Sequence, residues 1–180
     1  MNRCDGHDIG ARNAIEVRQA AQAEFYAAIG RFVLSWAGLE ICLDLLLLTI
    51  VKTPERQVKL PHQLGEKIAL IRSEIKSLPD AQQIAITDVI DEIGSYTDTR
   101  HDFVHGGSMN HFIEQGLITV TLARLLQPPR RPRRKTRKVT PPEINVISDR
   151  IHHLGDRLLD LTETLLTGSS QAGPEKEKSR

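Results

Sequence analysis

The chain has 180 residues, of which 39% are hydrophobic and 26% are charged, a balance that is ordinary for one soluble globular domain. Aromatic residues make up 4%, so leucine, isoleucine and alanine must fill most of the interior, which favours helices over a β-sandwich. Cys4 lies in a polar leader and Cys42 in an apolar run, so the sequence implies no disulfide framework and favours a reducing, cytoplasmic location.

The formal net charge of +1 conceals one strongly basic segment. Residues 130–138, RRPRRKTRK, carry seven positive charges and no acid, so the rest of the chain has a formal charge of −6. The basic residues are Arg130, Arg131, Arg133, Arg134, Lys135, Arg137 and Lys138. Such a cluster indicates a polyanionic partner, although a solvated loop has the same composition.

The most apolar stretch, FVLSWAGLEICLDLLLLTIV (residues 32–51), is interrupted by Glu40 and Asp44. A carboxylate near the middle of a bilayer is costly, so we interpret this stretch as a buried helix rather than a membrane span. Residues 1–10 lack an apolar centre, so we do not interpret them as a secretory signal.

Apolar residues spaced three and four apart predict three helices in the first 104 residues. The first begins near Asn13 and ends before Thr53, the second lies between Pro61 and Pro79, and the third covers residues 79–104. The expected core faces are Phe25, Ile29, Phe32, Trp36, Leu39, Leu43, Leu47 and Ile50, then Leu64, Ile68, Ile71, Ile75 and Leu78, then Ile86, Ile90, Ile93, Thr97, Arg100 and Val104. Because the first helix is longer than its partners, we expect part of its apolar face to contact another chain.

The pattern changes after Gly107. The alternating sequence LITVTL (residues 117–122) predicts a short hairpin, and residues 127–139 are expected to form an exposed basic loop. Thr140 and Glu143 fit a capping box at the start of a last helix, with Pro141 in its first turn. The core face of that helix is Ile144, Ile147, Ile151, Leu154, Leu158, Leu161 and Leu165.

These elements predict an all-α protein, a four-helix up-and-down bundle with a short β-hairpin or loop insertion between helices three and four. We expect a flexible leader at residues 1–12, the helical domain at 13–166 with its basic loop at 127–139, and a disordered tail at 167–180.

The sequence TRHDFVHGG (residues 99–107) closes the predicted third helix. On a continuous helix four residues share one polar stripe: Asp98, His101, Asp102 and His105. Arg100 instead falls on the apolar face, in line with Ile93. Because a guanidinium keeps its charge, Arg100 needs an anion or water at that position.

Glu40 interrupts the apolar face of the first helix in the same way, so the two opposite charges are expected to meet. Either a buried Arg100–Glu40 ion pair holds two helices in register, or the pair positions Arg100 for a phosphate. Arg100 and His105 are about 140° apart on an ideal helix. Gly106 and Gly107 permit the helix to end at His105, which lets that side chain turn toward a shared cleft; alternatively, a second copy of the chain completes the cleft.

The segment RHDFVH (residues 100–105) resembles the R-x4-6-H motif of the HEPN superfamily (higher eukaryote and prokaryote nucleotide-binding). In that family the motif closes the third helix of a four-helix bundle. The sequences FVLSWAGLE and LGEKIALI on the first two helices, and an insertion before the last helix, agree with the resemblance, which covers about residues 20–166.

The resemblance implies a metal-independent endoribonuclease that needs no cofactor and acts as a homodimer whose two motifs line one cleft. Arg100 would bind the scissile phosphate, and His105 would act as general base or acid. His101 stands where the family often has asparagine or aspartate, and Asp102 follows it on the polar stripe. The basic segment would attract the RNA backbone. Toxins and defence effectors occur in this family, which implies a possible antitoxin partner such as a nucleotidyltransferase.

Two other functions remain open. His101 and His105, one turn apart, could bind a metal with Asp98 or Asp102, and His111, His152 and His153 are further candidates. A HEPN-like module could also bind a nucleotide, an RNA or a protein without cleaving it. The sequence contains no glycine-rich phosphate loop, nucleophile elbow or paired-cysteine motif, and Cys42 is expected in the core.

Overall fold

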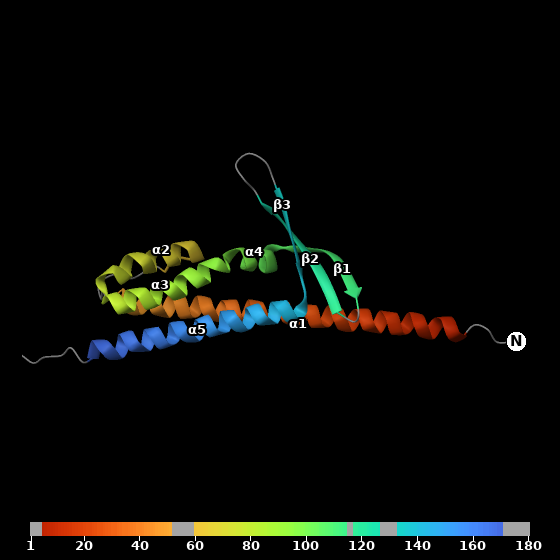
Figure 1. Cartoon of the computed structure of the whole chain (residues 1–180), viewed down its shortest axis with the longest axis horizontal. Helices are drawn as coiled ribbons and strands as arrows, with labels where there is room; N and C mark the ends of the chain where they lie inside the picture. Colours follow the sequence, from red (N-terminus) through yellow and green to blue (C-terminus); the bar gives the residue numbers. More distant parts are fainter. Residues whose placement is uncertain (1–4, 52–59, 115–116, 127–132, 171–180) are drawn as a thin grey trace, which may run out of the picture. The chain divides into compact units, whose positions relative to one another are not determined.

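The computed structural model describes residues 5–51, 60–114, 117–126 and 133–170, and these are mostly helical (Figure 1). The helices are α1 (Asp5–Ile50), α2 (Leu64–Glu74), the 3-10 helix η1 (Ile75–Ser77), α3 (Asp80–Ser95), α4 (Thr97–His105) and α5 (Pro141–Ser170). The strands are β1 (Gly107–Glu114), β2 (Leu117–Leu126) and β3 (Arg133–Val139). The prediction of a mainly helical protein with a hairpin before the last helix is confirmed.

The chain divides into two compact units, whereas the sequence predicts one domain over residues 13–166. Unit 1 takes its residues from Met1–Ser35 and Thr97–Asp149, and so holds α4, the sheet and the first parts of α1 and α5. Unit 2 takes its residues from Trp36–Tyr96 and Arg150–Arg180, and holds α2, η1, α3 and the remaining parts of α1 and α5.

Unit 2 is a group of helices around an apolar core. Figure 1 shows its parts of α1 and α5 running in the same direction and α3 running the opposite way, whereas an up-and-down bundle reverses direction at every helix. Its buried apolar side chains include Trp36, Leu39, Leu43, Leu46, Leu47, Ile71, Ile86, Val89, Ile90, Ile93, Ile151, Leu154 and Leu158. Most of the core positions predicted from three-four spacing are therefore buried.

Ion pairs join the helices of unit 2. The buried Lys67 of α2 lies 2.5 Å from the Asp44 carboxylate of α1. Arg150 of α5 donates two hydrogen bonds to the Glu92 carboxylate of α3, one of them at 2.7 Å, and Arg157 lies 3.6 Å from the same carboxylate. This bidentate contact fixes the spacing of α3 and α5.

Cys42 lies in the interior of unit 2. A Cβ atom at Gly155 of α5 would be in ordinary contact with the Cys42 Sγ, at 3.7 Å. Burial raises the pKa of the Cys42 thiol, and the Asp156 carboxylate adds to the increase. The thiol is therefore a poor nucleophile at neutral pH, which agrees with a role in the core.

α1 begins at Asp5, eight residues before the predicted start near Asn13, and runs to Ile50. Its segment Ile15–Ile50 is long and apolar enough to cross a membrane by length and composition, and 39% of its most apolar window is buried inside the structure. A core helix of a soluble protein passes the same test, so this finding leaves the cytoplasmic location a prediction.

The predicted third helix is interrupted at Tyr96, whose backbone N–H donates to the Ile93 carbonyl at 3.1 Å in a tighter turn than an α-helix makes. The predicted continuation of the core face through Arg100 and Val104 holds only in part. Arg100 is half-buried, with its Nε inaccessible to solvent, whereas Val104 is 42% exposed. The buried residues of α4 are Thr99, Asp102 and Phe103.

The predicted basic loop is also wrong over part of its length, because Arg133–Val139 forms strand β3 and pairs antiparallel with β2. Val139 lies opposite Val120, and Arg137 lies opposite Leu122. Ile118, Val120 and Leu122 alternate as buried residues, so this face of the sheet forms the interior of unit 1. Residues 133–139 are mostly basic, so they lack the alternation of apolar and polar residues by which a strand is predicted.

Candidate functional site

α4 carries four of the five residues that the sequence predicts as catalytic. Arg100 and His101 are half-buried, Asp102 is 3% exposed, and His105, the last residue of the helix, is exposed. The rings of His101 and His105 lie one turn apart, with centroids 5.6 Å from each other and planes 31° apart. The predicted polar stripe thus holds for the two histidines, whereas Asp102 turns into the interior.

Arg100 and His105 do not converge within one helix. α4 ends at His105, as the two glycines predict, but His105 itself stays helical. Five residues of α-helix turn by about 140°, so the two side chains leave the helix in different directions. A cleft completed by a second copy of the chain, the alternative that the sequence leaves open, stays a prediction.

Gly106 fixes the end of α4. Its backbone N–H donates to the Asp102 carbonyl at 3.0 Å, and a Cβ atom at this position would lie 2.1 Å from the same oxygen. No side chain fits in that space, so glycine is required here. At Gly107 the nearest atom to an added Cβ is the Ala123 carbonyl oxygen at 3.9 Å, which is ordinary contact.

Aromatic packing holds α4 against α1. The ring of Phe103 meets the ring of Phe32 edge to face, with centroids 4.7 Å apart and an interplanar angle of 87°. Both rings are buried, at 5% and 0% exposed. This contact fixes one side of α4. His105 is exposed, whereas Arg100 is half-buried.

Arg137 of β3 holds α4 from the sheet side. Its Nη1 donates to the Thr99 hydroxyl at 2.7 Å, and its guanidinium carbon lies 5.3 Å from the centroid of the Phe103 ring. Thr99 and Phe103 stand on either side of Arg100 along the helix. The guanidinium that the sequence assigns to RNA binding therefore contacts the helix that carries Arg100.

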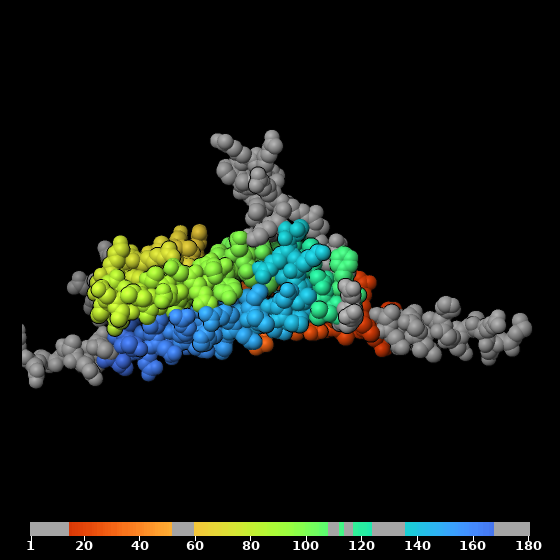
Figure 2. Space-filling view, viewed as in Figure 1, coloured from red at the N-terminus to blue at the C-terminus, as the bar shows by residue number. Residues whose placement is uncertain are grey.

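Four of the other basic residues, Arg133, Arg134, Lys135 and Lys138, lie on β3, which is an edge strand because the sheet order is β1-β2-β3. Arg133, Arg134 and Lys135 pair in register with Leu126, Leu125 and Arg124, and the Lys138 side chain is exposed. Arg130 and Arg131 lie outside the described residues. Figure 2 shows the surface of the end of β3 and the start of α5, in cyan, adjoining that of α4, in green.

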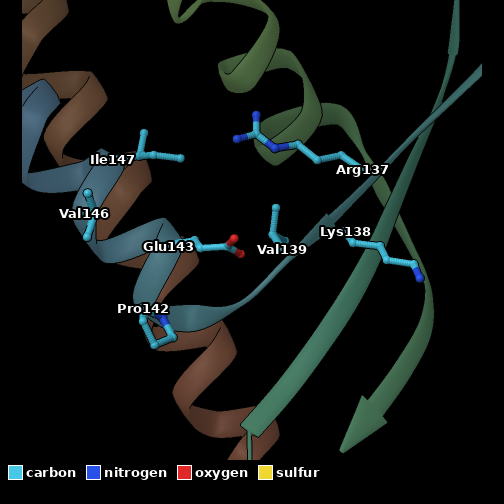
Figure 3. A pocket seen from close by; sticks show the side chains of 7 residues that line it. All are labelled: Arg137, Lys138, Val139, Pro142, Glu143, Val146 and Ile147. Carbon is cyan, nitrogen blue, oxygen red and sulfur yellow. The ribbon is translucent and has the colours of Figure 1, made fainter.

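A pocket of about 440 Å³ lies where β3 meets α5 (Figure 3). The lining residues are Arg137, Lys138, Val139, Pro142, Glu143, Val146 and Ile147. The Glu143 Oε2 accepts hydrogen bonds from the backbone N–H and the hydroxyl of Thr140, at 2.8 and 2.9 Å, so the predicted capping pair is confirmed. α5 begins at Pro141, also as predicted.

Glu40, the remaining predicted site residue, is half-buried on α1 and accepts a hydrogen bond from Trp36 Nε1 at 2.8 Å. Glu40 belongs to unit 2 and Arg100 to unit 1, and each is described within its own unit. The Arg100–Glu40 ion pair therefore stays a prediction.

Among the side chains that the structure describes, no group of three or more His, Cys, Asp or Glu residues is arranged to hold a metal ion. His152 of α5 lies 4.0 Å from Asp156, one turn away, and both side chains are largely exposed. The side chain of His111 is not among those described.

Sequence reasoning missed the residues that hold α4 in place, namely Thr99, Phe103 and the guanidinium of Arg137. The signal for Phe103 was present, because it is the bulkiest apolar residue of TRHDFVH. The hydrogen bond between Arg137 and Thr99 could not be predicted, because it joins positions 38 apart and depends on a strand that has no recognisable sequence pattern.

Comparisons with protein-family models, with curated proteins and with solved structures found no match for this chain.

Proposed function

We propose that the chain is a metal-independent, HEPN-like endoribonuclease in which Arg100 and His105 act on RNA at a site formed by two copies of the chain. The observation that supports this most is the placement of both groups on α4, a helix held by Arg137, Phe103 and Gly106 beside a basic edge strand. Rigid support of this kind is what a site needs to keep its groups oriented.

The proposed reaction is attack of a ribose 2′-oxygen on the neighbouring phosphorus. His105 takes the proton of the 2′-hydroxyl, the new P–O bond forms, and the bond to the 5′-oxygen of the next nucleotide breaks. That 5′-oxygen leaves with a proton from a protonated histidine or water, so the products are a 2′,3′-cyclic phosphate and a 5′-hydroxyl. Arg100 stabilises the added negative charge on the phosphorane.

His101 and Asp102 have supporting roles in this mechanism. The imidazole of His101 lies beside that of His105 and limits its orientation. Asp102 is buried, and its carbonyl oxygen accepts the hydrogen bond that ends α4. Glu40 would contribute by pairing with Arg100, as the sequence predicts.

Two copies are needed because Arg100 and His105 leave one helix about 140° apart. A two-fold dimer would bring Arg100 of each chain toward His105 of the other, with the helices packed in a HEPN-like bundle. In this proposal the protein is cytoplasmic and its substrate is RNA. If it acts as a toxin or defence effector, its partner is an antitoxin such as a nucleotidyltransferase.

The test is RNA cleavage in the presence of EDTA. The unmodified chain is expected to yield fragments ending in a 2′,3′-cyclic phosphate, and His105→Ala and Arg100→Ala are each expected to slow cleavage by roughly 10²-fold or more. His152→Ala removes an exposed histidine from α5 and serves as the matched control. Circular dichroism shows whether each variant is folded.

The second candidate, an RNA-binding module without catalysis, is favoured by the basic edge strand β3. In that case the chain binds RNA with a salt-dependent affinity, no fragments form, and His105→Ala leaves binding unchanged.

A further inference from the structure

We infer that the pocket between β3 and α5 binds one unstacked base of a single-stranded RNA whose backbone follows the basic strand β3. This inference rests on the proposed function, because it defines a subsite for the same substrate. The pocket lies wholly within unit 1, beside the helix that carries Arg100 and His105 (Figure 3).

The size and walls of the pocket suit a flat ring. Its volume of about 440 Å³ lies within the range of roughly 300–1,000 Å³ that is usual for small-molecule sites. Its apolar wall is formed by Val139, which is buried, Pro142, Ile147 and Val146, of which the last is 69% exposed at the rim. An unstacked base can pack its face against apolar side chains and stack on the plane of an arginine.

The charges of the pocket favour a nucleic acid over an apolar peptide. Two of the seven lining residues are cations, Arg137 and Lys138, and Arg133, Arg134 and Lys135 precede them on the same strand. The single acid, Glu143, already accepts two hydrogen bonds through its Oε2 from Thr140. A polyanionic chain that follows β3 would therefore reach the pocket with its phosphates facing positive charge.

Arg137 connects the pocket to the candidate catalytic helix. Its side chain lines the pocket, while its Nη1 donates to Thr99 and its guanidinium lies over Phe103. Thr99 immediately precedes Arg100, so a base held against Arg137 would place the adjoining phosphodiester near α4. The pocket would thus set which nucleotide lies next to the cleaved bond.

The inference is tested by equilibrium binding of a fluorescent 2′-O-methyl RNA hexamer, which has no free 2′-hydroxyl and so cannot be cleaved by the proposed reaction. Val146→Trp places a large side chain at the rim without changing the charge, and we expect it to weaken binding about tenfold with the same salt dependence. Lys138→Ala is expected to weaken binding and to lower the slope of log K against log salt by roughly 0.7.

Two matched variants control for general effects: Val33→Trp adds the same side chain at a 41% exposed valine of α1, and Lys76→Ala removes an exposed lysine of η1. Both should bind like the unmodified chain. A hexamer of the same length with abasic positions should bind at least tenfold more weakly than the complete one, because it has the phosphates without the bases.

Equal binding by Val146→Trp and the unmodified chain would overturn the inference, and would indicate that the pocket takes something other than a base, such as an apolar side chain of a protein. Equal binding of the abasic hexamer would also overturn it. Since the probe is uncleavable, a chain that binds it through the pocket but never cleaves natural RNA contradicts the proposed function and leaves the pocket assignment standing.

Discussion

Arg137 Nη1 donates a hydrogen bond to the Thr99 hydroxyl at 2.7 Å and thereby joins the edge strand of the sheet to the helix that carries Arg100. In the sequence the basic segment and the arginine–histidine motif are separate features. Within unit 1 they are neighbours, and one basic residue spans the distance between them.

Loss of this contact should destabilise unit 1. Arg137→Ala removes a charged hydrogen bond and a cation–π contact, and we expect the free energy of unfolding to fall by about 1–3 kcal/mol. Combined with Thr99→Val, it should show a coupling energy of at least about 0.5 kcal/mol in denaturant titrations. Lys138→Ala, at the next residue, has an exposed side chain and should change stability little. Strictly additive effects of Arg137→Ala and Thr99→Val would mean that the bond does not form.

The two glycines after α4 should respond differently to substitution. Gly106→Ala puts a Cβ atom 2.1 Å from the Asp102 carbonyl oxygen, so the end of α4 must shift, at an expected cost of about 2 kcal/mol or more. Gly107→Ala meets its nearest atom at 3.9 Å and should be tolerated, within about 1 kcal/mol. Thermal unfolding of the two variants side by side measures the difference. Equal midpoints would contradict the backbone approach at Gly106.

Glu92 should make the stability of unit 2 depend on pH. The hydrogen bond from Arg150 lowers the pKa of the Glu92 carboxyl, and the charges of Arg150 and Arg157 add to the decrease. A carboxylate whose pKa is lowered by folding stabilises the fold at pH values above the pKa of the unfolded state, which is about 4.3 for glutamate. This contribution disappears as the pH falls through the lower pKa of the folded state. The side chains of Glu92 and Arg150 are 26% and 42% exposed, so we expect roughly 1 kcal/mol.

Glu92→Gln should therefore be less stable than the unmodified chain at pH 7, and the difference should shrink in acid. Chemical denaturation at several pH values measures it. Asp88→Asn removes an exposed carboxylate one turn away on α3 and serves as the control. A difference between Glu92→Gln and the unmodified chain that stays constant from pH 7 to acid would contradict the assignment.

The basic strand should supply the salt-dependent part of RNA binding. Changing Arg133, Arg134 and Lys135 together to glutamine should reduce the slope of log K against log salt by roughly 2, since each phosphate contact on a single strand contributes about 0.7. Fluorescence anisotropy across a salt series gives the slope. Arg72→Gln, which removes an exposed arginine of α2 paired with Asp91, should leave it unchanged. An unaltered slope in the triple variant would exclude β3 from the RNA contact.

Local rules were sufficient for most of the helical part of the fold. Three-four spacing identified the buried faces of α1, α2, α3 and α5, and Thr140, Pro141 and Glu143 identified the start of α5. These features depend on residues within a few turns of one another, which is the range over which a sequence pattern is informative.

The site was harder to predict because it depends on one turn and one strand. The helix predicted over residues 79–104 ends at Ser95, and the separate helix α4 buries Thr99, Asp102 and Phe103 while Val104 is exposed. β3 consists mostly of basic residues, so it lacks the alternation of apolar and polar residues by which a strand is predicted. Only its pairing with β2 identifies residues 133–139 as a strand. Because β3 was not predicted, the contact between Arg137 and α4 could not be predicted either.

The most direct test of the two-chain site is to mix Arg100→Ala and His105→Ala chains under conditions that exchange subunits, and to measure cleavage of RNA in EDTA. If Arg100 of one chain works with His105 of the other, random exchange restores about a quarter of the unmodified activity, because half of the dimers are mixed and each of those has one complete site. A mixture as inactive as either variant alone, although both are folded and dimeric, would contradict the shared site.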